Sequence, residues 1–182
     1  MPEIELIELD KAFSCYGIAT EGAVHELKAI YAEMFAENTY LQNGVTIPEG
    51  EFVVDVGANV GIFSLFVKSL RPRARILAFE PMFHNLLALH KNLQLHNATD
   101  VEVVPHGLSG AHEGTATFTF YPNLPGNSTR NRQARNATAM PSPMPGATPS
   151  ATNCTEERRS RSRLSACPRP WPAIPALNAS IC

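Results

Sequence analysis

The residues of this sequence that could do chemistry lie at the end of one short, largely apolar run, residues 52–56, and directly after it. They are an acid, two glycines, an alanine and an asparagine: Asp55, Gly57, Ala58, Asn59 and Gly61. A short apolar run is typical of a strand that is buried in a parallel sheet. The glycines allow the chain to turn tightly and to come close to a ligand before a helix begins at about Ile62. The pattern predicts a loop that binds a nucleotide cofactor.

Two classes of cofactor use such a loop, and its residues separate them. A dinucleotide such as NAD requires a third glycine, so that the backbone can meet a pyrophosphate. This sequence has Asn59 at that place, and Asp55 would repel a pyrophosphate. An acid there suits a ligand with a cationic amino-acid end, which favours S-adenosylmethionine. The alternative is that Asp55 and Asn59 only bond to backbone groups of the turn.

A second acid lies at the end of the next apolar run. Residues 76–79 predict another buried strand, and Glu80 follows it, 19 residues after Gly61. In a strand–helix–strand unit, an acid at this place lies beside the cofactor ribose, where its two oxygens can accept both sugar hydroxyls. The alternative is that Glu80 only caps the helix that opens at Pro81, since acids favour helix starts.

The elements that must position these residues can be read from the spacing of apolar side chains. Helical periodicity predicts helices over residues 24–35, from Ile62 to about Arg71, and from Pro81 to about His96. Short strands are predicted at residues 45–47, 101–104 and 115–121. Strands that alternate with helices predict an α/β fold with a parallel sheet.

The chain consists of two unlike parts. Through Tyr121 it has 7 basic and 15 acidic residues, and from Pro122 onward it has 8 arginines and 2 glutamates. All 9 Phe and all 6 His precede Tyr121, whereas 10 of the 15 Pro follow it. A segment so poor in large apolar residues cannot bury enough surface to offset its ordering entropy. We therefore expect a disordered tail over residues 130–182.

Composition also bears on partners and compartment. The net charge of −2 gives no general affinity for nucleic acid, and no apolar run approaches the roughly 20 residues that cross a bilayer. The acidic start is unlike a signal peptide, and the four cysteines have no zinc-like spacing. We expect a cytoplasmic protein without a metal site.

Motifs in consistent order then indicate a family. The segments 31–35, 40–47, 54–66, 78–81, 106–109 and 118–122 together resemble an FkbM-family methyltransferase. The resemblance implies a Rossmann-like class I methyltransferase fold and S-adenosylmethionine as cofactor. It implies that Asp55, Gly57, Ala58, Asn59 and Gly61 hold the methionine part and that Glu80 holds the ribose. The implied reaction is O-methylation of a small-molecule hydroxyl, in a sugar or a natural product.

The resemblance implies a partial methyltransferase domain, the cofactor-binding half, over residues 23–129, preceded by an N-terminal segment over residues 1–22. The later strand of the family, which carries acids beside the methyl group, has no counterpart here, so no catalytic residue is assigned and we expect a truncated, impaired or inactive enzyme. We hypothesise that the tail is out-of-frame translation, which would explain the abrupt change of composition. Two other readings are an NAD-binding oxidoreductase-like fragment and a non-catalytic interaction protein with a basic tail, whose arginines lie at residues 158–163.

Overall fold

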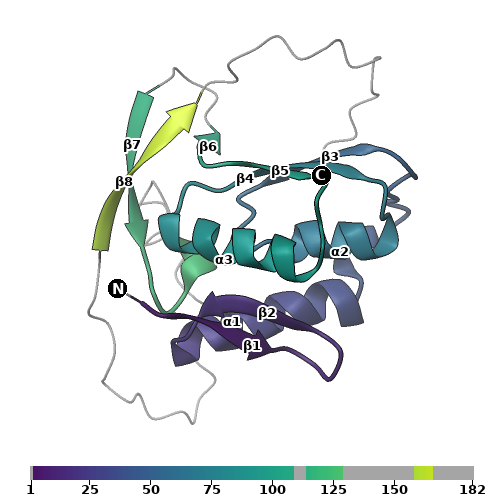
Figure 1. Cartoon of the computed structure of the whole chain (residues 1–182), viewed down its shortest axis with the longest axis horizontal. Coiled ribbons are helices and arrows are strands. Elements are labelled where there is room, and N and C mark those ends of the chain that lie inside the picture. The colour runs from purple at the N-terminus through teal and green to yellow at the C-terminus, as the bar shows by residue number, and fades with distance from the viewer. Residues whose placement is uncertain (1, 109–113, 129–157, 166–182) are drawn as a thin grey trace.

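The computed structural model describes residues 2–108, 114–128 and 158–165. Its centre is a three-stranded parallel sheet in the order β3 (Phe52–Val56), β4 (Arg75–Phe79) and β5 (Val101–Val104). Helix α2 (Ile62–Leu70) connects β3 to β4, and α3 (Phe83–Leu95) connects β4 to β5. The predicted α/β fold with a parallel sheet is confirmed, and its connectivity is Rossmann-like (Figure 1).

Both crossover helices cover the same face of this sheet (Figure 1). A buried cluster joins Leu65 of α2, Ala78 of β4 and Leu89 of α3. A second cluster joins Val67 of α2 to Ile76 of β4, with Val53 of β3 packed against it. Burial of these apolar side chains is the main force that stabilises a fold of this kind.

The opposite face of the sheet is apolar and exposed along β3. Alternate side chains of a strand point to opposite faces, and Val54 and Val56 are 43% and 62% exposed. Within the described residues β3 pairs with β4 alone, so it is an edge strand. This strand therefore has an open hydrogen-bonding edge on one side and an exposed apolar face among the described residues.

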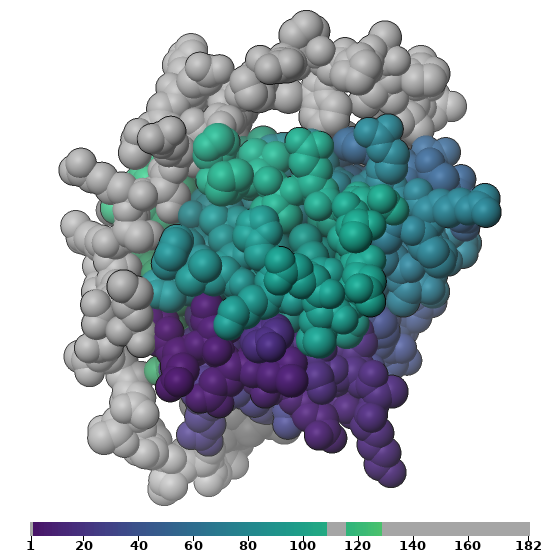
Figure 2. Space-filling view, viewed as in Figure 1, coloured from purple at the N-terminus to yellow at the C-terminus, as the bar shows by residue number. Residues whose placement is uncertain are grey.

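An N-terminal layer lies under the helices. Strands β1 (Ile4–Glu8) and β2 (Ser14–Ile18) form an antiparallel hairpin, followed by α1 (Glu21–Tyr31), which continues as a π-helical turn over Ala32–Ala36. The hairpin lies directly against α3 in the space-filling view (Figure 2). We expected residues 1–22 to form a separate segment; in the structure Ile7 and Cys15 pack into the same core as α1, α2 and α3.

A third sheet contains β6 (Gly107–Leu108), β7 (Gly114–Phe120) and β8 (Arg158–Ser165), with β8 between the other two. We expected residues 130–182 to lack persistent structure, and β8 differs from that expectation at its eight residues. The expectation rested on side-chain burial, but a strand is held by backbone hydrogen bonds, which β7 supplies in antiparallel register. The other residues of this segment lie outside the described residues.

Two further expectations concern the described part of the chain. The predicted strand at residues 45–47 is wrong: this segment has no regular structure, and it follows a turn in which Asn43 and Gly44 have positive φ. Within the ranges that the structure describes, no helix combines the length and the apolar character that a bilayer crossing requires.

Candidate functional site

The glycine loop between β3 and α2 is held in place by the end of β4. The backbone N–H groups of Gly57 and Ala58 both donate to the carbonyl oxygen of Phe79, at 2.8 and 2.9 Å. The N–H of Asn59 donates to Glu80 Oε2 at 2.8 Å. Three consecutive N–H groups are therefore engaged within the protein.

The conformation of the loop explains its composition. Gly57, Asn59 and Gly61 have φ values of 80°, 53° and 91°, the left-handed region that glycine adopts freely and asparagine tolerates. Gly61 also lies against the core, because a Cβ atom there would be 2.4 Å from Leu89 Cδ1. At Gly57 a Cβ atom would meet nothing within 4 Å. Gly61 is thus required for packing, and Gly57 leaves space open.

Asp55, one residue before the end of β3, is a buried acid, 7% exposed. Its Oδ2 accepts a hydrogen bond from Ser64 Oγ of α2 at 2.7 Å. Burial raises the pKa of Asp55, and the bond from Ser64 partly offsets this shift. The sequence reasoning did not identify Ser64; the signal was a lone hydroxyl in the otherwise apolar run of residues 62–67.

Glu80 is 4% exposed, and both of its oxygens accept hydrogen bonds. Besides the bond from Asn59, Oε1 accepts from the N–H of Met82 at 2.8 Å and from Asn85 Nδ2 at 3.4 Å. Burial raises the pKa of Glu80, these hydrogen bonds oppose the shift, and the charge of Asp55 adds to it. Glu80 therefore ties the loop to the start of α3, so the alternative role as a helix-start acid is part of what it does.

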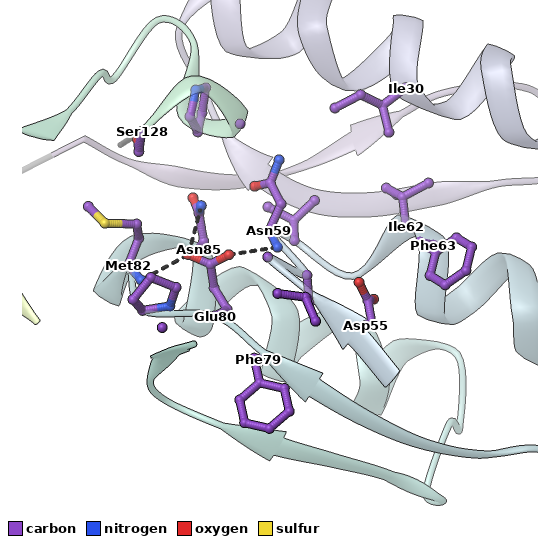
Figure 3. A pocket seen from close by; sticks show the side chains of 18 of the residues that line it. Ile30, Asp55, Asn59, Ile62, Phe63, Phe79, Glu80, Met82, Asn85 and Ser128 are labelled. Carbon is purple, nitrogen blue, oxygen red and sulfur yellow. Dashed lines mark hydrogen bonds between the residues drawn. The ribbon is translucent and has the colours of Figure 1, made fainter. Parts of the chain in front are cut away.

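A cavity of about 720 Å³ lies over this loop, which is a size typical of a small-molecule site. Five of the six residues that the sequence proposed line it: Asp55, Gly57, Ala58, Asn59 and Glu80. Gly61 is the exception, because it faces Leu89 instead. Figure 3 shows Glu80, Asn85 and Met82 at one end of the cavity and Asp55, Ile62 and Phe63 at the other.

The charged side chains that line the cavity are all acidic among the described residues. Glu33, Asp55 and Glu80 are its ionisable carboxyl groups, and no Lys, Arg or His is among the described residues that line it. In addition, Asn59 and Asn85 each have a buried amide oxygen without a hydrogen-bond partner in the described structure. A pyrophosphate would face acids here without a compensating cation, whereas a cationic ligand with hydrogen-bond donors would be stabilised.

Residues from the far end of the described domain close the cavity. Pro125, Gly126 and Ser128 line it, and the N–H of Gly126 donates to Glu26 Oε2 of α1 at 3.0 Å. The same segment is anchored where Thr20 Oγ donates to the carbonyl oxygen of Pro122 at 2.9 Å. Sequence analysis missed this wall, since a contact across about 100 residues leaves no local pattern.

Two other features complete the description of the site. Tyr40 lines the cavity and is 48% exposed, and its ring centroid lies 5.3 Å from that of Phe63. Among the described residues there is no group of three or more His, Cys, Asp or Glu side chains arranged to hold a metal ion.

Several known proteins have sequences similar to that of this chain. The chain is 37% identical over 129 residues to Methyltransferase 1 of Beauveria bassiana, an alignment that covers 71% of this chain and 50% of that protein. It is 41% identical over 133 residues to Methyltransferase sdnD of Sordaria araneosa, covering 72% of this chain and 48% of that one. The 31-O-demethyl-FK506 methyltransferase FkbM of Streptomyces tacrolimicus is 35% identical over 98 residues, covering 54% and 37%.

The N-terminal part of the chain is homologous to methyltransferases, FkbM among them. The resemblance that the motifs indicated is confirmed. The chain spans about half the length of the curated relatives Methyltransferase 1 and sdnD. No family model matches the chain.

Solved structures give weaker likenesses. A crystal structure of methyltransferase FkbM from Methylobacillus flagellatus is 19% identical with a TM-score of 0.38, covering 47% of this chain and 23% of that one. A crystal structure of coclaurine N-methyltransferase bound to N-methylheliamine and SAH is 23% identical with a TM-score of 0.36, covering 40% and 21%.

Proposed function

We propose that the cavity binds S-adenosylmethionine and that the domain serves methyl transfer to a small-molecule hydroxyl. The observation that carries the proposal is the lining of the cavity, which contains three carboxyl groups and, among the described residues that line it, no basic side chain. S-adenosylmethionine has a cationic sulfonium, a cationic amino group and a ribose diol, so it supplies the charges and donors that this lining lacks. Its sulfonium is the source of the methyl group.

Each residue has a part in this proposal. Asp55 and the open space at Gly57 would receive the methionine end, and Glu80 the ribose end. The two acids lie at opposite ends of the cavity (Figure 3). The loop residues Ala58 and Asn59 position Glu80 through the hydrogen-bonded junction with β4. Gly61 supports the site indirectly, because it has no side chain and so leaves room for the side chain of Leu89 against the loop.

The choice of a hydroxyl acceptor rests on the relatives. The Streptomyces tacrolimicus relative FkbM is a 31-O-demethyl-FK506 methyltransferase, which supports O-methylation for this chain. We expect turnover by this chain to be impaired, because in the described residues the wall of the site beside β3 is an exposed strand edge. Cofactor binding, which needs only the described residues, is therefore the property to measure first.

The test is isothermal titration calorimetry of the 182-residue chain with S-adenosylhomocysteine, the product form of the cofactor, and with NAD. We expect saturable binding of S-adenosylhomocysteine and none of NAD. Glu80→Gln removes a charged acceptor, and charge-assisted hydrogen bonds contribute about 1.5–3 kcal/mol, so affinity should fall about ten- to hundredfold.

Glu102→Gln is the matched control, because Glu102 is exposed on β5 and lies outside the cavity. It should bind as the unaltered chain does. Thermal melting of each variant shows whether a loss of affinity reflects a loss of folded protein. Binding of NAD in preference to S-adenosylhomocysteine, or equal binding by both Glu variants, would contradict the proposal.

A further inference from the structure

One hydroxyl lies where the packing of α2 favours an apolar side chain. Ser64 is 0% exposed, and residues 65–67 of the same helix are buried and apolar. Serine is a weaker helix former than alanine, and a buried hydroxyl without a partner costs free energy. The fold supplies a partner from another element, because Ser64 Oγ donates to Asp55 Oδ2 of β3 at 2.7 Å. This contact accounts for a serine at a position that otherwise favours an apolar residue.

The other serine of α2 shows the more usual arrangement. Ser69 Oγ donates to the carbonyl oxygen of Phe66 at 2.7 Å, within its own helix. A serine inside a helix commonly bonds in this way to a carbonyl of the preceding turn. Ser64 instead donates across to a carboxylate on the neighbouring strand. The hydroxyl of Ser64 therefore serves Asp55 and not its own helix.

Asp55 depends on this one side chain. Among the described residues no other side chain donates a hydrogen bond to its carboxyl group. The other titratable side chains that line the cavity are Glu33, Tyr40 and Glu80, and none of the described lining residues is basic. Burial raises the pKa of Asp55, whereas the side chain of Ser64 and, to a smaller extent, its backbone lower it. In the absence of a neighbouring cation among these residues, Ser64 is the group that stabilises the ionised carboxylate.

We propose that Ser64 is a positioning residue for the cationic end of the ligand, because its hydroxyl keeps Asp55 ionised and fixes the orientation of the carboxylate. Asp55 lines the cavity beside Ile62 and Phe63 (Figure 3), whereas Ser64 does not line it. The hydroxyl therefore acts on the ligand through the carboxylate. The inference rests on the proposed function in assigning the amino group of the methionine end to Asp55.

The test compares two ligands that differ in the amino-acid end. Calorimetry would titrate the 182-residue chain and its Ser64→Ala variant with S-adenosylhomocysteine and with methylthioadenosine, which has a methyl group in place of the amino-acid chain. A hydrogen bond to a charged group corresponds to roughly a ten- to hundredfold change in affinity. Because the backbone of Ser64 still contributes in the variant, we expect about a tenfold loss for S-adenosylhomocysteine and no loss for methylthioadenosine.

The pH dependence of binding distinguishes control of ionisation from a loss of packing. A cationic amino group binds the ionised form of Asp55 better, so the affinity for S-adenosylhomocysteine should fall as the pH is lowered through the pKa of Asp55. Without the hydroxyl of Ser64 that pKa is higher, so the fall in Ser64→Ala should begin at a higher pH. Asp55→Asn should bind S-adenosylhomocysteine weakly at every pH, and adding Ser64→Ala to it should cause no further loss.

Matched variants control for shape and for the helix. Ser64→Thr keeps the hydroxyl and Ser64→Val has nearly the same shape without it, so only the valine variant should behave as Ser64→Ala does. Ser69→Ala removes the other hydroxyl of α2 outside the cavity and should bind both ligands as the unaltered chain does. Unchanged binding of S-adenosylhomocysteine by Ser64→Ala and Ser64→Val would overturn the inference and leave the proposed function standing. An equal loss for both ligands would do the same.

Failure of the proposed function has a different signature, because the unaltered chain would then bind neither ligand. Urea unfolding of the ligand-free chain across pH still tests the effect of Ser64 on Asp55. Since the folded pKa of Asp55 is raised, the free energy of unfolding declines as the pH rises from the ordinary pKa to the raised one. An extension of this decline to higher pH in Ser64→Ala would support the inference. Coincident declines in Ser64→Ala and the unaltered chain would overturn it.

Discussion

Gly57 and Gly61 open and close the same loop, and we predict that alanine at each has a different consequence. Both have positive φ, 80° and 91°, so alanine at either place costs about 1–2 kcal/mol of backbone strain. At Gly61 the added Cβ would also lie 2.4 Å from Leu89 Cδ1, in a side chain that is 0% exposed. Overpacking of a filled core costs about 1–3 kcal/mol more. Gly61→Ala should therefore lower the free energy of unfolding by about 2–5 kcal/mol, and Gly57→Ala by about 1–2 kcal/mol.

The assay is urea unfolding followed by circular dichroism, together with calorimetry with S-adenosylhomocysteine. Gly50→Ala is the matched control for Gly57→Ala, because Gly50 has φ of 77°, also has open space at its Cβ position, and lies outside the cavity. Gly50→Ala and Gly57→Ala should lose similar stability, but only the latter should lose affinity. Equal stability losses at Gly57 and Gly61, or unchanged affinity in Gly57→Ala, would refute this reasoning.

Two further predictions concern buried charges. Burial raises the pKa of Asp55 above its ordinary value of 3.8. The contribution of protonated Asp55 to the free energy of unfolding is therefore fully present below pH 3.8 and is lost as the pH rises through the raised pKa. Asp55→Asn should flatten the decline in unfolding free energy above about pH 4, measured by urea unfolding across pH, and an unchanged profile would contradict the burial of the charge. Lys68 Nζ donates to the carbonyl oxygen of Ala74 at 3.0 Å and pairs with Asp100 at 3.2 Å. In urea unfolding, Lys68→Met should lower the free energy of unfolding by about 1.5–3 kcal/mol. Asp100→Asn should lower it by less than about 1 kcal/mol, because the side chain of Asp100 is 56% exposed. Equal losses in the two variants would count against this ranking.

The parallel sheet and its loop could be predicted because their signals are local. An apolar run followed by Asp55, Gly57 and Gly61 contains the strand, the turn and the helix start within about ten residues, and the structure has β3, the loop and α2 there. The spacing to Glu80 gave the second strand end in the same way. Residues 45–47 show the limit of such signals: their β-branched side chains favour a strand, but the described structure provides no partner for one.

Features that depend on distant contacts could not be predicted. The N-terminal hairpin packs on α3 through Asn92, which bonds to Tyr16 across 76 residues. Asn85 reads as one polar residue on an amphipathic helix until the fold brings it against Glu80. The wall at Pro125–Asn127 depends on Glu26 of α1, whose bond to Gly126 spans 100 residues. The sequence therefore predicted one side of the cavity, and the tertiary fold supplied the other.

The central claim is that this cavity is a site for S-adenosylmethionine, and a crystal structure of the chain grown with S-adenosylhomocysteine tests it most directly. The account predicts electron density for the ribose beside Glu80 and for the methionine end beside Asp55 and Gly57. An empty cavity at a saturating ligand concentration would contradict the account, as would a ligand bound elsewhere or in the reverse direction.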